Sequence, residues 1–324
     1  MCAAIRSVWF RITIWFVATI LLGSITNGKF GTTLADEQNR YPKKVAVFLS
    51  MEIKPYLQAA EALTRRLDEV GQYRIKQIIF DASETQDLET FREQIANGEY
   101  DIVVTVGTQT SRFIADCRAE SNVPVVYTML INTEDIFKNE DNVVGVSLNI
   151  PVELQLQEIK KTIPNAKTIG VLFNPKYNTR FVSEAETLGM KMGLNVEAIE
   201  VNDKTSIPKA LSVNWYRMEA IWLIPDWTVT SSESINQYII KEALLRKVPV
   251  IGYNRSFYNY GAAIALILDY EKIGVQTAEI VIDRLEKGIS RELSPAFETA
   301  VNRRVLRQMG IVPGEHSERE PEWP

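Results

Sequence analysis

The sequence predicts an α/β protein with two similar doubly wound parallel-sheet lobes joined by a hinge. Three observations lead to this prediction. Short apolar, β-branched runs alternate with helix-like segments, the same order of elements occurs twice, and one strand-like segment leads directly from the first half into the second. Alternation of strands and helices is typical of parallel sheets with right-handed crossovers.

The first half begins with an apolar run, Val45–Leu49, whose length and composition predict a strand buried on both faces. Apolar residues spaced by three and four between Tyr56 and Val70 predict an amphipathic helix, and Gly71 is placed to end it. Further apolar or alternating runs predict three more strands: Ile75–Phe80, Asp101–Val106 and Val123–Thr128.

The second half repeats this order of elements. IGVLFNP (169–175) corresponds to VAVFLSM (45–51), and a helical stripe that begins at Phe181 corresponds to the first helix. Any doubly wound protein shows some self-similarity, but ordered agreement over five elements favours a duplicated lobe. The remaining strands correspond in pairs: Asn195–Val201 with Tyr73–Phe80, Ala220–Pro225 with Asp101–Gly107, and Val248–Tyr253 with Val123–Thr128.

The lobe boundaries follow from this repeat. We expect a first lobe of residues 42–147 completed by about 256–290, and a second lobe of 148–255 completed by about 291–312. The polar, proline-containing tail 313–324 is expected to be disordered. Ligands of open α/β sheets bind beyond the carboxyl ends of the strands, so two facing lobes would share one cleft that closes by a hinge.

The N-terminus predicts an export signal over residues 1–35. Arg6 and Arg11 precede a short apolar core, Ile12–Leu22, and the small-x-Ala pattern of Thr33–Ala35 follows. The apolar core is about half as long as a spanning helix. An uncleaved anchor and an incorrect start codon are the alternatives. We therefore expect the mature protein in the periplasm or elsewhere outside the cytoplasm.

Composition excludes several classes of function. The only histidine is His316, in the tail, which removes Ser-His-Asp and Cys-His sites and histidine-ligated zinc. Cys117 is the only cysteine after the signal, so the mature chain has no disulfide and Cys117 is expected to be a small buried hydrophobe. The net charge of −5 argues against nucleic acid. We expect no catalytic residue, metal or cofactor, and a monomer.

In the first lobe, the candidate ligand-binding residues follow strands. Thr108 and Gln109 begin a helix directly after a strand, and free N–H groups there, with the hydroxyls of Thr108 and Thr110, favour an anion such as a carboxylate. A plain helix cap is the alternative. Thr128 ends the fourth strand, and Glu52, after the first strand, is a weaker candidate.

The second lobe has corresponding candidates. Asp226 could accept an ammonium group, Trp227 could stack on a ring or sugar face, and Thr228 follows them. Asn174 and Asn178 follow the first strand of this lobe and offer both donors and acceptors, as a zwitterion or hydroxyl requires. Helix capping, loop packing and ordinary turn formation are the alternatives.

Asn254 completes the candidate set, since it ends the strand that corresponds to the one ending at Thr128. Aromatic residues cluster beside Asn254. They could form a wall for an apolar ligand, although such residues more often serve packing. They are Tyr253, Phe257, Tyr258 and Tyr260.

Four segments resemble the ABC-transporter substrate-binding family that includes tryptophan/tyrosine-binding proteins. They are NVVGVSLNIPVELQL (142–156), PNAKTIGVLFNP (164–175), LDYEKIGVQTAEIVIDRLEKG (268–288) and VNRRVLRQMGI (301–311). The resemblance implies a type I periplasmic binding protein-like fold, a small-molecule ligand and an ABC permease as partner. Two loops depart from the family pattern: IPDWTV (224–229), one residue shorter than I-P-x-D-N-T-V, and Ser50–Pro55.

These observations predict an extracytoplasmic solute receptor that closes on an amino acid or similar solute and delivers it to an ABC permease. A sensory module that signals to a membrane partner is the main alternative, because the same lobes serve both. A two-domain transferase acting on nucleotide sugars is a third hypothesis. It requires a base and a phosphate site, which the sequence does not clearly display.

Overall fold

The computed structural model describes residues 42–314, except 82, 84, 119–120, 132 and 138–141. The predicted signal, residues 1–35, and residues 315–324 of the predicted tail lie outside the described residues. Within the described part, no helix is both long enough and apolar enough to span a bilayer.

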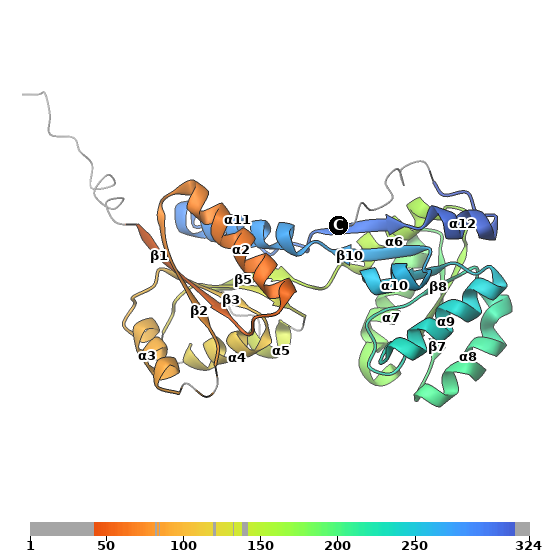
Figure 1. Ribbon diagram of the computed structural model, residues 1–324, viewed down its shortest axis with the longest axis horizontal. Helices are drawn as coiled ribbons and strands as arrows, with labels where there is room; N and C mark the ends of the chain where they lie inside the picture. Colours follow the sequence, from red (N-terminus) through yellow and green to blue (C-terminus); the bar gives the residue numbers. More distant parts are fainter. Residues whose placement is uncertain are drawn as a thin grey trace, which may run out of the picture. The chain divides into compact units, whose positions relative to one another are not determined.

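The first lobe contains a five-stranded sheet in which all strands are parallel, in the order β2-β1-β3-β4-β5 (Figure 1). Its strands are β1 (Lys43–Leu49), β2 (Tyr73–Ile79), β3 (Ile102–Val106), β4 (Val125–Leu130) and β5 (Val143–Ser147). Its connecting helices are α2 (Lys54–Val70), α3 (Thr85–Ala96), α4 (Thr108–Cys117) and α5 (Glu134–Phe137).

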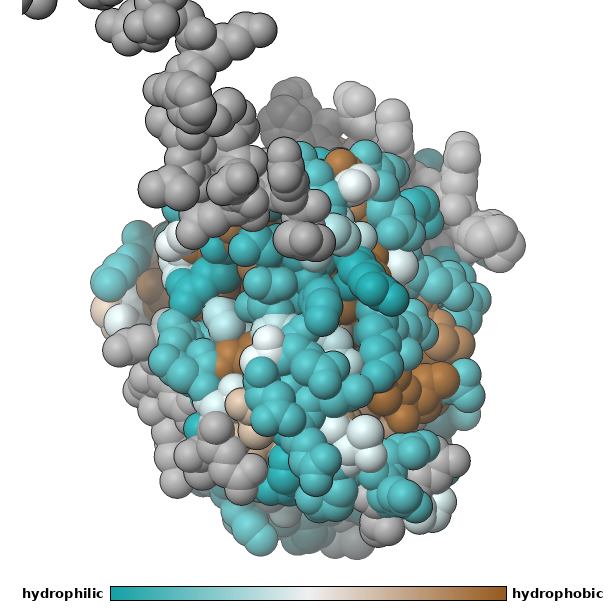
Figure 2. Space-filling model, turned by 90° about the vertical axis from the view of Figure 1, so that its left-hand side faces the viewer, coloured by the Kyte–Doolittle hydropathy of each residue, from teal (hydrophilic) through white to brown (hydrophobic). Residues whose placement is uncertain are grey.

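Helices cover both faces of this sheet, which explains its continuous apolar strands. Successive side chains of a strand point to opposite faces. Val45 and Val47 of β1 therefore pack with α2 and α11 (Tyr270–Lys287), whereas Ala46 and Phe48 pack with α3 and α4. Cys117 of α4 is buried, as expected. The face shown in Figure 2 is mostly hydrophilic, and its largest group of hydrophobic residues lies toward the right of the view.

The second lobe contains a six-stranded sheet in the order β11-β10-β9-β8-β6-β7, and only β11 is antiparallel. Its strands are β6 (Thr168–Phe173), β7 (Asn195–Glu200), β8 (Ala220–Trp222), β9 (Val250–Gly252), β10 (Ile264–Leu268) and β11 (Phe297–Val301). Its helices are α6 (Val152–Thr162), α7 (Pro175–Lys191), α8 (Ile207–Asn214), α9 (Glu233–Arg246), α10 (Arg255–Tyr260) and α12 (Arg303–Met309), with two short 3-10 turns, η1 (Lys204–Ser206) and η2 (Trp215–Arg217).

The two sheets share one topology. The parallel strands of the second lobe, β7-β6-β8-β9-β10, repeat the order of β2-β1-β3-β4-β5 in the first. The predicted α/β class with two parallel-sheet lobes is confirmed. The strand pairs that the sequence aligned occupy equivalent positions, so the repeat reflects a duplicated architecture.

The structure corrects the predicted boundary near the C-terminus. The sequence predicts that residues 256–290 as a whole belong to the first lobe, but β10 lies in the second sheet, where it pairs with β9 and β11. Only α11 returns to the first lobe, because its apolar side packs against α2 and the sheet. The side chain of Arg66 in α2 supports this contact by donating to Glu279 in α11 at 2.7 Å.

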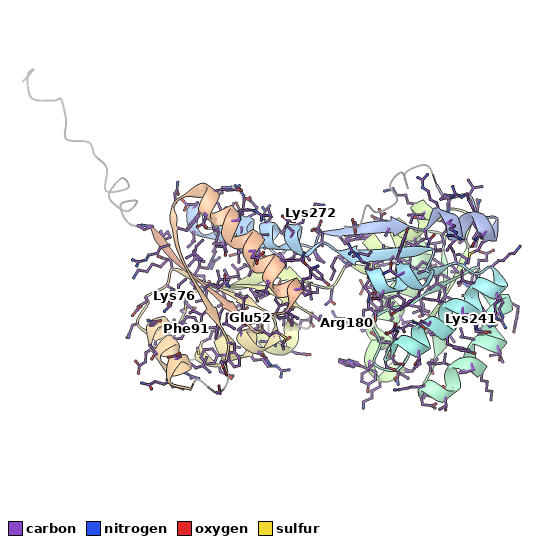
Figure 3. The ribbon with its side chains drawn as sticks, viewed as in Figure 1. Glu52, Lys76, Phe91, Arg180, Lys241 and Lys272 are labelled. Atoms are coloured by element: carbon purple, nitrogen blue, oxygen red, sulfur yellow. The ribbon has the colours of Figure 1, made fainter. Side chains whose placement is uncertain are left out.

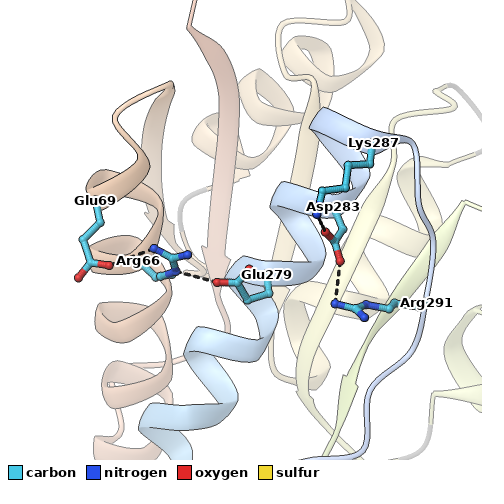
Figure 4. A network of polar contacts seen from close by, with 6 residues as sticks. All are labelled: Arg66, Glu69, Glu279, Asp283, Lys287 and Arg291. Carbon is cyan, nitrogen blue, oxygen red and sulfur yellow. Dashed lines mark hydrogen bonds and ion pairs between the residues drawn. The ribbon is translucent and has the colours of Figure 1, made fainter.

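The segment after α11 is also held by the first lobe. Asp283, which is buried, accepts from Lys287 at 2.8 Å and pairs with Arg291 at 2.7 Å (Figure 4). The hydrogen bond from Lys287 is the main reason why the pKa of Asp283 is lowered. The N–H of Leu293 donates to the carbonyl of Gly145 in β5 at 3.1 Å. Residues 291–296 are predicted to complete the second lobe, but Arg291 and Leu293 contact the first lobe.

Candidate ligand-binding site

Each sheet has a topological switch point, where adjacent strands lead to helices on opposite faces. In the first lobe this point lies between the carboxyl ends of β1 and β3, since α2 and α4 cover opposite faces. The equivalent point in the second lobe lies between β6 and β8. Ligands of open α/β sheets bind at such points. Eight of the nine candidate residues follow strands at the carboxyl edges of the two sheets, and Thr128 lies within β4, two residues before its end.

At the first switch point, Gly107 makes a close approach that only glycine allows. Its φ angle is +98°, and an added Cβ would lie 2.5 Å from a ring carbon of Tyr56 and 2.8 Å from Ser50 Oγ. The Ser50 hydroxyl accepts the N–H of Thr110 at 3.0 Å. The N–H of Gly107 donates to the carbonyl of Thr128 at 2.9 Å. The ends of β1, β3 and β4 are therefore tied together around the start of α4.

This arrangement leaves the first turn of α4 available to a ligand. Thr108 and Gln109 are exposed, and their N–H groups have no hydrogen-bond partner in the described part of the chain. The positive end of a helix dipole favours an anion there. The hydroxyl of Thr110, which the sequence associated with the same anion, is instead fully buried and lies 3.1 Å from Ser50 Oγ.

Thr128 contributes an unusual feature to the same edge. Thr128 is 1% exposed, and its hydroxyl oxygen has no hydrogen-bond partner among the described residues. The pairing of β4 with β5 shifts register between Thr128 and Leu130, and Met129 has a φ angle of +58°. A buried, unpaired hydroxyl is uncommon because its desolvation is not offset. It is a free polar group beside the strand end that Gly107 contacts.

At the second switch point, one carboxylate organises the strand ends. Asp226 follows β8 and is 5% exposed. One of its oxygens accepts the N–H of Asn174 and the amide of Asn178, both at 2.8 Å. The other accepts the N–H groups of Thr228 at 2.8 Å and Val229 at 2.9 Å. The start of α7 and the turn after β8 are thereby joined through a single side chain.

The network extends to the neighbouring strand. The amide of Asn174 donates to the hydroxyl of Thr228 at 2.8 Å, and the N–H of Asp226 donates to the hydroxyl of Thr230 at 2.9 Å. Tyr253, after β9, donates its O–H to Thr230 at 3.2 Å. The pKa of Tyr253 is raised, mainly by burial and further by the negative charge of Asp226, against the hydrogen bond with Thr230.

The structure shows that the carboxylate of Asp226 is already engaged within its own lobe. The sequence leads us to expect a carboxylate that is free to accept a ligand ammonium. In the structure, four donors from its own lobe use the acceptor capacity of both oxygens. The physical reason is that N–H groups at the start of α7 and in the turn after β8 require an acceptor. Asn174 and Asn178 are likewise engaged within the lobe.

Exposed apolar side chains surround both switch points. Trp227 lies in the turn after β8 and is 81% exposed, and Tyr177, in the first turn of α7, is 47% exposed. In the first lobe, Met51 and Ile53 follow β1 and Ile131 follows β4, all exposed. Of these five, only Trp227 is a candidate predicted from the sequence. Their common signal was present, since each is a large apolar residue placed just after a predicted strand.

The remaining candidates lie after β9 and after β1. Asn254 caps α10 by accepting the N–H of Phe257 at 3.2 Å. Phe257 is buried in the core of the second lobe, and Tyr260 donates to Glu233 at 2.6 Å, so these aromatics pack rather than form an open wall. Glu52, labelled in Figure 3, is exposed in the loop after β1.

Comparison with known proteins decides the family. Residues 44–317 match the family described as ABC transporter substrate binding protein. The chain belongs to this family. Its members are extracytoplasmic binding proteins without catalytic activity, which agrees with the absence of catalytic groups expected from the sequence. The chain is therefore a substrate-binding protein of an ABC transporter.

Individual relatives are distant. A tyrosine-binding protein from Clostridioides difficile (strain R20291) is 22% identical over 206 residues, which span 61% of this chain and 58% of that protein. A domain from Streptococcus pneumonia in complex with L-Trp is 22% identical, with a TM-score of 0.53 over 86% of this chain and 99% of the other. A ligand-free, open substrate binding protein from Clostridium difficile is 20% identical, with a TM-score of 0.70 over 86% and 98%. The fold is that of type I periplasmic binding proteins.

Proposed function

We propose that this protein binds an amino acid with an aromatic or other large apolar side chain and delivers it to the permease of its ABC transporter. The observation that carries this proposal is the exposed indole of Trp227, placed at the second switch point on a turn that the buried Asp226 network anchors. An exposed tryptophan on an anchored turn offers a flat apolar surface for a ring, and aromatic pairs contribute about 0.5–1.5 kcal/mol beyond burial.

The first switch point suits the other end of such a ligand. The unpaired N–H groups of Thr108 and Gln109 favour an anionic ligand group, and a carboxylate is the anion that every amino acid carries. The apolar side chains of Met51 and Ile131 lie at the same edge of the sheet. Polar recognition in one lobe and apolar recognition in the other would require both lobes to close on one solute.

The named relatives support this ligand class. One is a tyrosine-binding protein, and another was crystallised with L-Trp. Trp227 lies in a loop that departs from the family pattern, so the relatives alone do not carry the proposal. The proposal rests also on the residues of this chain.

The test is thermal unfolding of the purified protein against a panel of amino acids, sugars and nucleosides. A ligand present at a hundred times its dissociation constant stabilises the folded state by ~2.7 kcal/mol. We expect a Tm increase of about 5 °C with L-tryptophan, L-tyrosine or L-phenylalanine, and none with sugars. A shift confined to sugars or nucleosides would contradict the proposal.

A variant then ties the binding to the site. Trp227→Ala should raise the dissociation constant of the selected amino acid about tenfold, because a stacking partner is lost. Titration calorimetry measures this constant. Tyr216→Ala is the matched control. Tyr216 is 85% exposed in η2, before β8, at the opposite end of the strand from Trp227, so its removal should leave affinity unchanged.

A further inference from the structure

The carboxylate of Asp226 is buried beside the proposed ligand site, yet it has no acceptor position left. Each of its oxygens receives two donors at 2.8–2.9 Å. A carboxylate offers about four lone-pair sites, so a ligand ammonium would have to displace a donor from the lobe itself. Displacement would leave a buried N–H without a partner, which is costly.

The four donors come from two segments that present exposed groups. Asn174 and Asn178 belong to the start of α7, which also presents Tyr177. Thr228 and Val229 belong to the turn that presents Trp227. Asp226 is therefore the side chain through which the two aromatic-bearing segments keep a fixed relation to each other.

We propose that Asp226 is a positioning residue for ligand recognition: it fixes the turn of Trp227 against the start of α7 and does not itself bind the ligand. This inference rests on the proposed function of the same site. It differs from the usual expectation for a carboxylate in an amino-acid site, which is a direct ion pair with the ligand ammonium.

The two roles predict different responses to Asp226→Asn. An asparagine keeps one carbonyl oxygen but places an NH2 group opposite two of the four donors, so one segment loses its anchor. The probes are L-tryptophan and indole-3-propionate, which keeps the ring and carboxylate but lacks the ammonium. If Asp226 is a positioning residue, both probes should bind about tenfold more weakly, by the same factor. A loss for L-tryptophan that is at least tenfold greater than for indole-3-propionate would overturn the proposal.

A second measurement needs no ligand. In protein labelled with 5-fluorotryptophan, Trp227→Phe identifies the fluorine resonance of Trp227. Asp226→Asn should shift and broaden that resonance, because the turn loses its fixed geometry, while the resonance of buried Trp222 stays in place. An unchanged Trp227 resonance would contradict the inference. If neither probe binds the wild-type protein, the proposed ligand class fails, and this resonance still decides the role of Asp226.

Asp203→Asn is the matched control. Asp203 follows β7 in the same lobe and accepts the N–H groups of Thr205 at 2.8 Å and Ser206 at 3.0 Å, the same local pattern as Asp226. It is exposed and has no bond to α7 among the described contacts. We expect unchanged affinity for both probes and an unchanged Trp227 resonance.

Asn178→Ala provides a milder variant in case Asp226→Asn does not fold. It removes one donor of the four, so that α7 loses the hydrogen bonds from the Asn178 amide to Asp226 and to the carbonyl of Pro225. If Asp226 is a positioning residue, Asn178→Ala should lower the affinity for both probes by the same factor. Under an ion-pair role, it would free one acceptor position on Asp226 for the ammonium, so L-tryptophan would gain affinity relative to indole-3-propionate, which would overturn the proposal.

Discussion

The two switch points occupy the same place in the same topology but are held together by different chemistry. At the first, a glycine with positive φ and the hydroxyl of Ser50 join the ends of β1 and β3. At the second, the carboxylate of Asp226 joins the ends of β6 and β8 through four hydrogen bonds. One junction is neutral and depends on close backbone approach, whereas the other is charged and depends on a single side chain.

The difference shows what a duplicated fold requires and what it leaves free. Both junctions must provide acceptors for N–H groups at helix or turn starts, because these groups have no partner within the helix. A hydroxyl can satisfy one such donor, so in the first lobe N–H groups of α4 stay available for an anion. A carboxylate can satisfy four such donors, so in the second lobe the N–H groups at the strand ends are paired with Asp226. The exposed group there is the aromatic ring of Trp227.

The largest effect is expected at the charged junction. Asp226→Ala removes the acceptor of three backbone N–H groups and the nearer of two acceptors of the Asn178 amide. We expect the free energy of unfolding in urea to fall by about 4 kcal/mol. Asp203→Ala, which removes an exposed cap in the same lobe, should cost about 1 kcal/mol. Equal losses for the two variants would show that the Asp226 junction is an ordinary cap.

The neutral junction should be sensitive to backbone space instead. Gly107→Ala combines a positive φ with a contact of 2.5 Å to the ring of Tyr56, so we expect a loss of about 3 kcal/mol in urea unfolding. Gly310→Ala separates the two causes, because Gly310 has a φ of +77° but no atom within 4 Å of an added Cβ. It should lose only about 1 kcal/mol. Similar losses would mean that φ strain alone governs Gly107.

A smaller effect should depend on pH. The junction at the first switch point is neutral, so the test asks whether the stability of the first lobe depends on a charged group elsewhere. Away from the switch point, Asp283 has a lowered pKa, first because Lys287 donates a hydrogen bond to it and also because of the charges of Lys287 and Arg291. A lowered folded-state pKa gives stability that is complete above the unfolded value of about 3.9 and is lost as pH falls through the folded value.

Asp283→Asn should therefore lower the free energy of unfolding by about 1–2 kcal/mol at pH 7. The difference from the wild type should shrink as pH falls below about 4, where the wild-type carboxyl becomes protonated. Urea unfolding at pH 7, 5 and 3 measures this. A difference that stays constant down to pH 3 would show that the contribution of Asp283 is packing rather than charge.

Much of the fold was predictable because its signals are local. Buried parallel strands give continuous apolar runs, as in Val45–Leu49, and helices between them give stripes spaced by three and four. The repeat of this pattern predicted the shared strand order. The C-terminal boundary was wrong because β10 is as apolar as any strand of either sheet, and only its pairing with β9 and β11 assigns it.

The site divides in the same way. The sequence by itself determined which residues follow strands, and therefore that Thr108, Asp226 and Trp227 lie at the carboxyl ends of parallel sheets. Only the tertiary structure decided that Asp226 is saturated by its own lobe while Trp227 is exposed. The physical reason is that hydrogen-bond capacity is filled by donors that are distant in the chain, here from Asn174 and Asn178, and no local pattern records which donors the fold will bring to a carboxylate.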